Sequence, residues 1–171
     1  INLTVIIPAA ENAVGPNSFR VGDVISGYSG KTVEVKNTDA EGRLILADAL
    51  AYAVDNYKIK SMVDVATLTG AVLSALGDQI AGVMKSDNAR GELNKLKRAS
   101  EESLEEIWEL PLNDAIRKGM KSKLADISNM SSIKGNHGSS SAAAFLEAFV
   151  GDTKWLHIDV AGTAMSGCFG T

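Results

Sequence analysis

Residues 37–43, which read NTDAEGR, place two carboxylates, a glycine and an arginine close together in the chain. Carboxylate oxygens are preferred ligands of divalent cations such as Mg²⁺ and Mn²⁺, so Asp39 and Glu41 are candidate metal ligands. Arg43 falls in the first turn of an expected helix, where the helix dipole disfavours a cation, and a nearby anion would explain its place. Gly42 would let such a ligand approach the backbone. The stretch therefore has the composition of a metal or anion site.

The same residues are also typical of the start of a helix. Thr38 and Glu41 have the spacing of a capping box, and Asn37, Thr38 and Asp39 are all favoured N-cap residues. The apolar run LILADALAYAV follows directly. The residues alone therefore leave a plain helix start and a ligand site open.

The elements that would position these side chains follow from hydrophobic periodicity. Apolar residues recur at helical spacing over residues 44–57, directly after the carboxylates. Further helices are expected at residues 69–76, 88–107 and 142–150. Strands are expected at residues 1–10, twice within 24–37, and at 61–68, 79–86 and 155–162. Strands that alternate with helices predict a single α/β domain, with a mixed, mainly parallel sheet flanked by helices.

Size and composition exclude several classes of protein. The chain has 171 residues, enough for one domain with a core, and its net charge of −4 gives nucleic acids and anionic membranes no electrostatic attraction. It contains no apolar run long enough for a membrane helix and opens without the features of a signal peptide. The single cysteine, Cys168, has no internal disulfide partner, which fits a reducing compartment. Because the chain opens inside a strand-like pattern without Met, we expect a fragment.

The segment NTDAEGRLILADAL resembles the signature of the leucyl aminopeptidases, the cytosol aminopeptidase family. Other segments resemble that family in the family's order: FRVGDVISGYSGKTVEVKNTDAEGR, DVATLTGAVLSALG, WELPL, ADISNMSS, GSSSAAAFLEAFV and WLHIDVAGTA. Together they cover nearly the whole chain. The resemblance implies that residues 1–171 are the C-terminal portion of the catalytic domain of a two-metal exopeptidase, which releases N-terminal, often apolar, residues from peptides.

The resemblance also implies roles for the residues of the signature. Asp39 would bind one metal ion through its side chain and its own carbonyl, and Glu41 would bridge both ions. Arg43 would hold a bicarbonate or similar anion that acts as general base toward the attacking water. Zn²⁺, Mn²⁺ and Mg²⁺ all accept oxygen ligands, so the identity of the metal stays open.

Five residues match family positions that lie near the substrate. Thr67, Leu68 and Gly70 belong to the TLTG turn, whose backbone lies beside the anion and the substrate in the family. Asn37 matches a residue near the substrate, and Ala161 matches part of the wall of the pocket for the N-terminal side chain. An ordinary structural role stays open for each, because the TLTG turn could simply end a strand and start a helix.

The chain departs from the family because some of the family's metal ligands belong to a segment upstream of its first residue. The family's remaining metal ligands, a lysine and two aspartates, and its second catalytic lysine belong to an upstream glycine-rich segment. Lys31, Lys36 and Asp23 stand in other motifs and do not replace them. We therefore expect the upstream segment and the N-terminal domain to be absent, and the chain alone to be inactive.

The two histidines and the cysteine show no pattern of a catalytic site. His137 and His157 form no H-E-x-x-H motif, so a zincin-type site is excluded. We expect His157 to be a structural hydrogen-bonding residue, His137 to be exposed in a loop, and the serines of GNHGSSS to cap a helix. Cys168 has neither a motif nor a basic neighbour and is expected to take no part.

Two other functions compete with the aminopeptidase. A non-catalytic piece could still assemble, since members of the family form hexamers, and a homo-oligomer is expected of the full-length protein. DNA binding is known for some bacterial members, but the acidic balance and the lack of a basic run longer than KLKR argue against it. The expected partners are peptide substrates, with no membrane, and the expected location is cytoplasmic.

Overall fold

The computed structural model describes residues 2–133, 135 and 137–165. Its elements in chain order are β1 (Val24–Ser26), β2 (Thr32–Glu34), α1 (Gly42–Asn56), β3 (Ser61–Ala66), α2 (Gly70–Leu76), β4 (Ala81–Lys85), α3 (Arg90–Ser103), β5 (Ile107–Glu109), α4 (Asp114–Gly119), β6 (Ile127–Ser128), α5 (Gly138–Glu147) and β7 (Lys154–Asp159). Strands and helices alternate, which confirms the expected mixed α/β class. Cys168 lies outside the described residues.

The strands form two sheets rather than the one sheet expected from the sequence. The larger sheet has the order β3-β7-β4-β5, with β3·β7 and β4·β5 parallel and β4·β7 antiparallel. The smaller sheet has the order β1-β2-β6, with β1·β2 antiparallel and β2·β6 parallel. Strand direction is therefore mixed and mainly parallel, as predicted.

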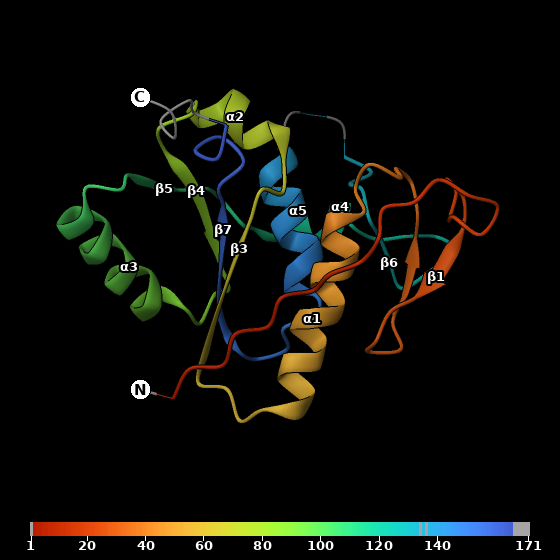
Figure 1. Cartoon of the computed structure of the whole chain (residues 1–171), viewed down its shortest axis with the longest axis horizontal. Coiled ribbons are helices and arrows are strands. Elements are labelled where there is room, and N and C mark those ends of the chain that lie inside the picture. The colour runs from red at the N-terminus through yellow and green to blue at the C-terminus, as the bar shows by residue number, and fades with distance from the viewer. Residues whose placement is uncertain (1, 134, 136, 166–171) are drawn as a thin grey trace.

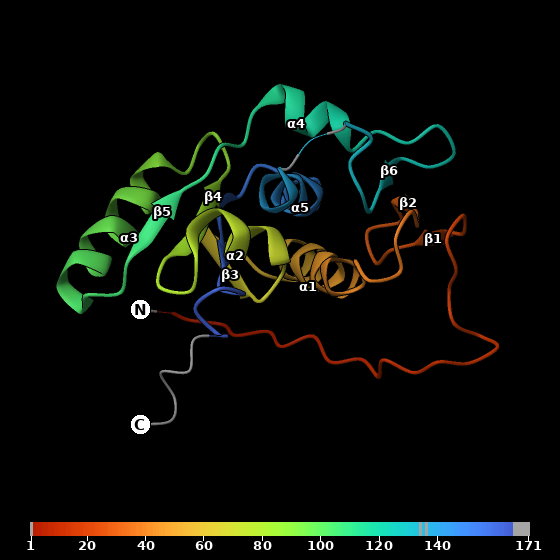
Figure 2. The ribbon, with the colours of Figure 1, turned by 90° about the horizontal axis from the view of Figure 1, so that it is seen from above.

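Helices cover both faces of the larger sheet. Successive side chains of a strand point to opposite faces, so each strand contributes to a core on either side. Met84 of β4 and Trp155 of β7 are buried in the main core with residues of α1 and α5. Their neighbours Val83 and Leu156 are buried on the other face with Leu93 of α3. Figures 1 and 2 show the resulting layers, with α3 on one side of the sheet and α1 and α5 on the other.

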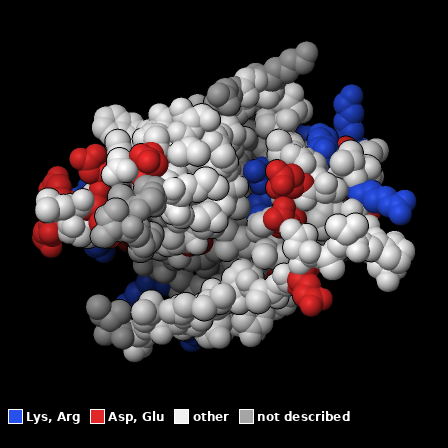
Figure 3. All heavy atoms as spheres, turned by 45° about the horizontal axis from the view of Figure 1, so that its top comes forward, with Lys and Arg blue, Asp and Glu red and all other residues white. Residues whose placement is uncertain are grey.

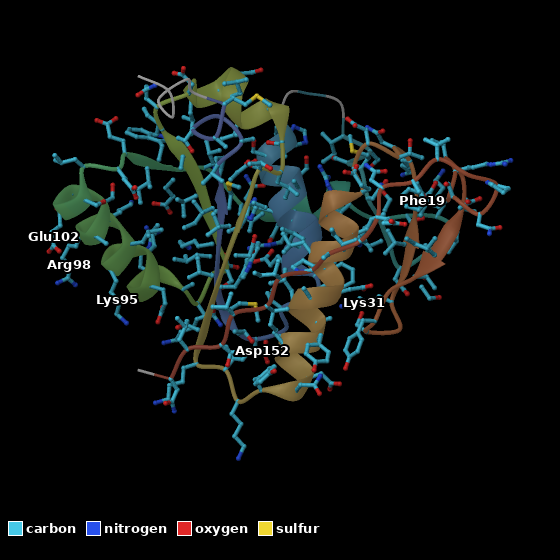
Figure 4. The ribbon with its side chains drawn as sticks, in the orientation of Figure 1. Phe19, Lys31, Lys95, Arg98, Glu102 and Asp152 are labelled. Carbon is cyan, nitrogen blue, oxygen red and sulfur yellow. The ribbon has the colours of Figure 1, made fainter. Side chains whose placement is uncertain are left out.

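Helix α3 keeps one charged face in solvent, as its sequence predicts. Leu93 is its only fully buried residue, whereas Lys95, Arg98 and Glu102 point away from the molecule (Figure 4). Acidic and basic side chains are scattered over the face shown in Figure 3, where the described residues form no continuous basic patch.

The prediction of a strand over residues 1–10 is wrong for residues 2–10, which are the ones that the structure describes. These residues are extended but belong to no sheet, and Leu3, Val5 and Ile7 are 80%, 70% and 82% exposed. Figure 2 shows this segment running along one side of the molecule. No hydrogen bond joins residues 2–10 to another described residue, and an apolar run without a ladder partner does not become a strand.

Within residues 2–133, 135 and 137–165, no helix is both long enough and apolar enough to cross a membrane.

Candidate functional site

The residues predicted to do chemistry follow the carboxyl ends of three strands. Residues 37–41 follow β2, residues 67–70 follow β3, and Ala161 follows β7. Strands β3 and β7 are parallel and in register, so the segments that follow them meet at one edge of the larger sheet. In open α/β sheets this is the edge at which ligands bind.

The NTDAEGR segment begins with a turn and not with a capped helix. Helix α1 starts at Gly42 with Glu41 at the N-cap position, and no side chain makes the capping hydrogen bond. The capping box of Thr38 and Glu41 is therefore not formed. Instead, the Asn37 Oδ1 atom accepts a hydrogen bond from the Asp39 backbone N–H at 3.0 Å. This Asx turn removes Asn37 and Asp39 from the helix, and it leaves both predicted ligand residues at the helix entrance.

Both carboxylates of this turn are available to a ligand. Asp39 is exposed and Glu41 is half-buried. Among the described residues, neither carboxylate accepts a hydrogen bond or forms an ion pair. Their oxygen chemistry fits a divalent cation, which carboxylates bind readily. The residues that the structure describes contain no group of three His, Cys, Asp or Glu residues that could hold a metal ion, so these two supply at most part of a coordination shell.

Arg43 lies buried directly behind the carboxylates. Its side chain is 6% exposed, and its Nη1 atom donates to the Asn129 carbonyl oxygen at 2.8 Å. Its Nε atom is buried and has no partner among the described residues. Burial lowers the pKa of Arg43 to about 10, although the charges of Asp159 and Glu41 act in the opposite direction. A buried guanidinium with an unused donor has the chemistry to bind an anion.

Asp159 organises the segments that follow β3 and β7, and sequence reasoning missed it. This fully buried carboxylate accepts hydrogen bonds from the backbone N–H groups of Leu68, Thr69 and Ala161 at 3.1, 3.4 and 3.3 Å. Its Oδ2 atom accepts from the Thr69 hydroxyl at 2.6 Å. A signal was present in the sequence, because Asp159 stands between Ile158 and Val160 in the mainly apolar run WLHIDV.

The structure brings most of the predicted substrate-binding residues into this region. Leu68 and Ala161 share Asp159 as their hydrogen-bond acceptor. A Cβ atom built on Gly42 would lie 3.8 Å from Leu68 Cδ1, so the TLTG turn lies against the start of α1. Thr67 and Gly70 are exposed beside Leu68, and Gly70 begins α2.

Two cavities among the described residues lie elsewhere. A cavity of about 400 Å³ is lined by residues within and just after α4 and α5, including Arg117 of α4 and Glu147 of α5. A second cavity, of about 580 Å³, is lined by Tyr28, Asp55 and Phe149 among others. Neither includes a residue of the predicted site, whose Asp39 carboxylate stands on open surface.

The histidines agree only in part with the sequence analysis. The His157 Nδ1 atom lies 2.6 Å from Asp64 Oδ1 inside the core, which confirms a structural hydrogen bond. His137 is half-buried rather than exposed and occupies the N-cap position of α5. The predicted serine cap is therefore wrong, because Ser141 lies within the helix and its hydroxyl donates back to the His137 carbonyl at 2.9 Å.

Comparison with known proteins gives consistent matches along the whole chain. The model of the cytosol aminopeptidase family, catalytic domain, matches residues 1–170. A protein of Fusobacterium nucleatum named "Probable cytosol aminopeptidase" is 48% identical over 163 residues, which are 95% of this chain and 33% of that protein. A protein of the same name from Geobacter sulfurreducens is 49% identical over 96% of this chain and 32% of its own length.

A solved structure supports the same relationship. A point mutant of tomato leucine aminopeptidase superposes with a TM-score of 0.86 and 41% sequence identity. The match covers 94% of this chain and 31% of the tomato chain. The chain thus spans about a third of the length of the relatives that it matches.

Proposed function

Because this chain belongs to the cytosol aminopeptidase family, we propose that it forms part of the active site of a two-metal aminopeptidase that releases N-terminal, often apolar, residues from peptides. The observation that carries the proposal is the geometry of the NTDAEGR segment. Two carboxylates without partners among the described residues stand at the entrance of α1, and a buried arginine with an unused Nε donor lies behind them.

Each residue of the segment has a role in this proposal. Asp39 and Glu41 would be the residues of this chain that hold two divalent ions (Zn²⁺, Mn²⁺ or Mg²⁺), with Glu41 as a ligand common to both. Ions bound there would supply Lewis-acid activation of the attacking water and of the scissile carbonyl. Arg43 would hold a bicarbonate or similar anion through its free Nε donor, and such an anion would supply the general base for the water.

The segments around Asp159 bind the substrate. The proposal gives the backbone of Thr67, Leu68 and Gly70 the place beside the peptide, and it gives Ala161 the wall of the pocket for the N-terminal side chain. Support comes from the convergence of Leu68 and Ala161 on the Asp159 carboxylate. Asn37 is the further substrate residue, and it already shapes the turn through its bond to the Asp39 N–H.

The remaining metal ligands belong to the part of the aminopeptidase that this chain does not cover. Each ion needs about four to six ligands, which two carboxylates do not supply. The chain is 33% of the length of a relative, and we place it in the C-terminal portion of the catalytic domain. On this proposal the chain alone binds metal weakly and does not turn over peptides.

The test is the hydrolysis of leucine 4-nitroanilide by the intact protein with added Mn²⁺ or Zn²⁺. Asp39→Asn and Glu41→Gln should each lower kcat/KM by more than about 100-fold, because loss of even an outer-shell partner costs about 10- to 100-fold. The matched controls are Asp152→Asn and Glu102→Gln, whose side chains are exposed and remote (Figure 4). Retention of most of kcat/KM in the Asp39 and Glu41 variants would remove them from the site.

The anion role of Arg43 has its own test. Arg43→Ala should lower kcat less than the changes at the metal ligands, and added bicarbonate should restore part of the loss. Bicarbonate should not affect the control variant Arg98→Ala, whose side chain is exposed on α3. An Arg43→Ala protein that does not respond to bicarbonate would contradict the role.

Assembly is a second candidate function, and one observation favours it. Strand β3 pairs only with β7 among the described strands, and its Val63 and Val65 side chains are 52% and 60% exposed. A strand edge with exposed valines favours contact with further polypeptide. Light scattering that shows a monodisperse monomer at all concentrations would count against assembly.

The proposal also includes the location, the oligomeric state and the partners of the protein. We place it in the cytoplasm as a homo-oligomer, a hexamer in its full-length form, with peptides as substrates. The names of the relatives support the location, since they are called cytosol aminopeptidases. A nucleic-acid partner stays outside the proposal because the net charge is −4, and a gel-shift assay at physiological salt would test this.

A further inference from the structure

We infer that Asn129 is the residue that positions the metal-binding turn and Arg43 relative to each other, an inference that rests on the proposed function. Asn129 directly follows β6 and is fully buried. It makes hydrogen bonds to the backbone of residues 36–40, and its own carbonyl oxygen accepts from Arg43 Nη1 at 2.8 Å. One residue thus contacts both halves of the site.

The Asn129 amide uses its hydrogen-bonding capacity entirely on this turn. Its Oδ1 atom accepts from the backbone N–H groups of Lys36 at 2.8 Å and Asn37 at 3.3 Å. Its Nδ2 atom donates to the carbonyl oxygens of Asn37 at 2.6 Å and Ala40 at 3.4 Å. An asparagine offers two donors and an oxygen with two lone pairs, so every site is filled. Only this orientation of the amide pairs donors with acceptors on both sides.

These four hydrogen bonds satisfy backbone N–H and C=O groups of the turn that no strand ladder pairs. Residues 36–40 come after β2 and before α1, so neither the strand nor the helix satisfies their polar groups. Among the described residues, no hydrogen bond or ion pair of the Asp39 or Glu41 carboxylate fixes these side chains. Their position therefore depends on the path of the backbone, which the Asn129 side chain sets.

Asn129 can set that path because the smaller sheet holds it in turn. Its backbone N–H donates to the Glu34 carbonyl at 3.0 Å and continues the parallel pairing of β2 with β6. The pairs Val33–Ile127 and Glu34–Ser128 precede it in register. The smaller sheet thereby fixes the position of the turn and, through the Asn129 carbonyl oxygen, that of the Arg43 side chain.

The first test compares the variants Asn129→Ala and Asn129→Asp with matched changes at Asn88. Asn88 also accepts one hydrogen bond at Oδ1 and donates one from Nδ2 to a backbone carbonyl, that of Asp152, but it lies in the turn between β4 and α3. Amide hydrogen exchange should accelerate at residues 36–43 in Asn129→Ala and stay at the parent rate there in Asn88→Ala. In Asn129→Asp the amides of Lys36 and Asn37 should stay closer to the parent rate, since both accepted bonds can persist.

The second test measures Mn²⁺ affinity of the intact protein by titration. Asn129→Ala should raise the Kd for Mn²⁺ by about 10- to 100-fold, the usual cost of an outer-shell change, and Asn88→Ala should leave it unchanged. Exchange that accelerates evenly over the whole chain in Asn129→Ala, or an unchanged Kd with a locally loosened turn, overturns the positioning role. If the parent binds no Mn²⁺, the proposed function fails, while the exchange result still decides whether Asn129 holds the turn.

Discussion

The Asp159 carboxylate offers the sharpest stability test of how the site is held together. It is fully buried, and it accepts from three backbone N–H groups, those of Leu68, Thr69 and Ala161, and from the Thr69 hydroxyl. Replacing it with alanine removes the acceptor of the three backbone N–H groups, whereas the Thr69 hydroxyl keeps the Ser139 hydroxyl as a partner at 2.8 Å. The replacement also removes a negative charge that stabilises the buried guanidinium of Arg43.

The size of the loss follows from the number and kind of these bonds. Removal of one partner from a buried charged network costs about 3–5 kcal/mol, and we expect Asp159→Ala to lower the free energy of unfolding by that amount. Asp159→Asn keeps the volume and one acceptor oxygen but loses the charge. Its loss should be about 1.5–3 kcal/mol, the value of a hydrogen bond to a charged group.

Urea unfolding followed by circular dichroism measures both losses. Asp152→Ala is the matched control, because that aspartate is exposed in the turn before β7 and should change stability by less than about 0.5 kcal/mol. A loss below about 1 kcal/mol in Asp159→Ala would refute the reasoning, since it would mean that the segments after β3 and β7 hold together without the carboxylate.

Three further changes test the packing and the surface. Gly162→Ala should prevent the native turn after β7, because the new Cβ would overlap the Gly77 carbonyl oxygen, and soluble expression compared with the parent measures this. Phe145→Ala removes a fully buried ring from the main core and should cost about 3–5 kcal/mol in urea unfolding. The hydrogen bond from Lys97 lowers the pKa of Glu109, so this pair stabilises the fold above the unfolded pKa of the carboxyl and loses its effect as the pH falls through the folded pKa. Lys97→Met should therefore lower the free energy of unfolding by about 0.2–1 kcal/mol at pH 7 and by nothing measurable once Glu109 is protonated.

The sequence predicted the elements whose signal is local. The helical spacing of apolar residues after residue 43 predicted α1, and Gly77 marked the end of α2, where it has φ of 73°. The strand predicted at residues 1–10 failed because β-branched apolar residues report a tendency to pair and not whether a partner is present. The short elements β5, α4 and β6 escaped prediction because they carry too few residues for a period.

The sequence was enough to propose the residues of the candidate site, but it did not reveal the residues that support them. Asp39, Glu41 and Arg43 form a compact motif, which a reader of the sequence can find. Asn129 and Asp159 act on partners that are 92 and 91 residues away in the chain, and no local pattern reveals such contacts. The same long-range bonds explain why the predicted capping box is not formed. The hydrogen bonds of Asn129 to residues 36–40 hold this segment as a turn in place of a local helix cap.

The proposed aminopeptidase activity depends above all on the binding of two metal ions by Asp39 and Glu41. Metal bound per molecule of the intact protein, measured by plasma mass spectrometry after equilibration with Mn²⁺, tests that binding directly. We predict about two ions in the parent and in Asp152→Asn, about one in Asp39→Asn, and fewer than in the parent for Glu41→Gln, which loses the bridging ligand. Equal metal content in the parent and in both site variants would contradict metal binding by Asp39 and Glu41.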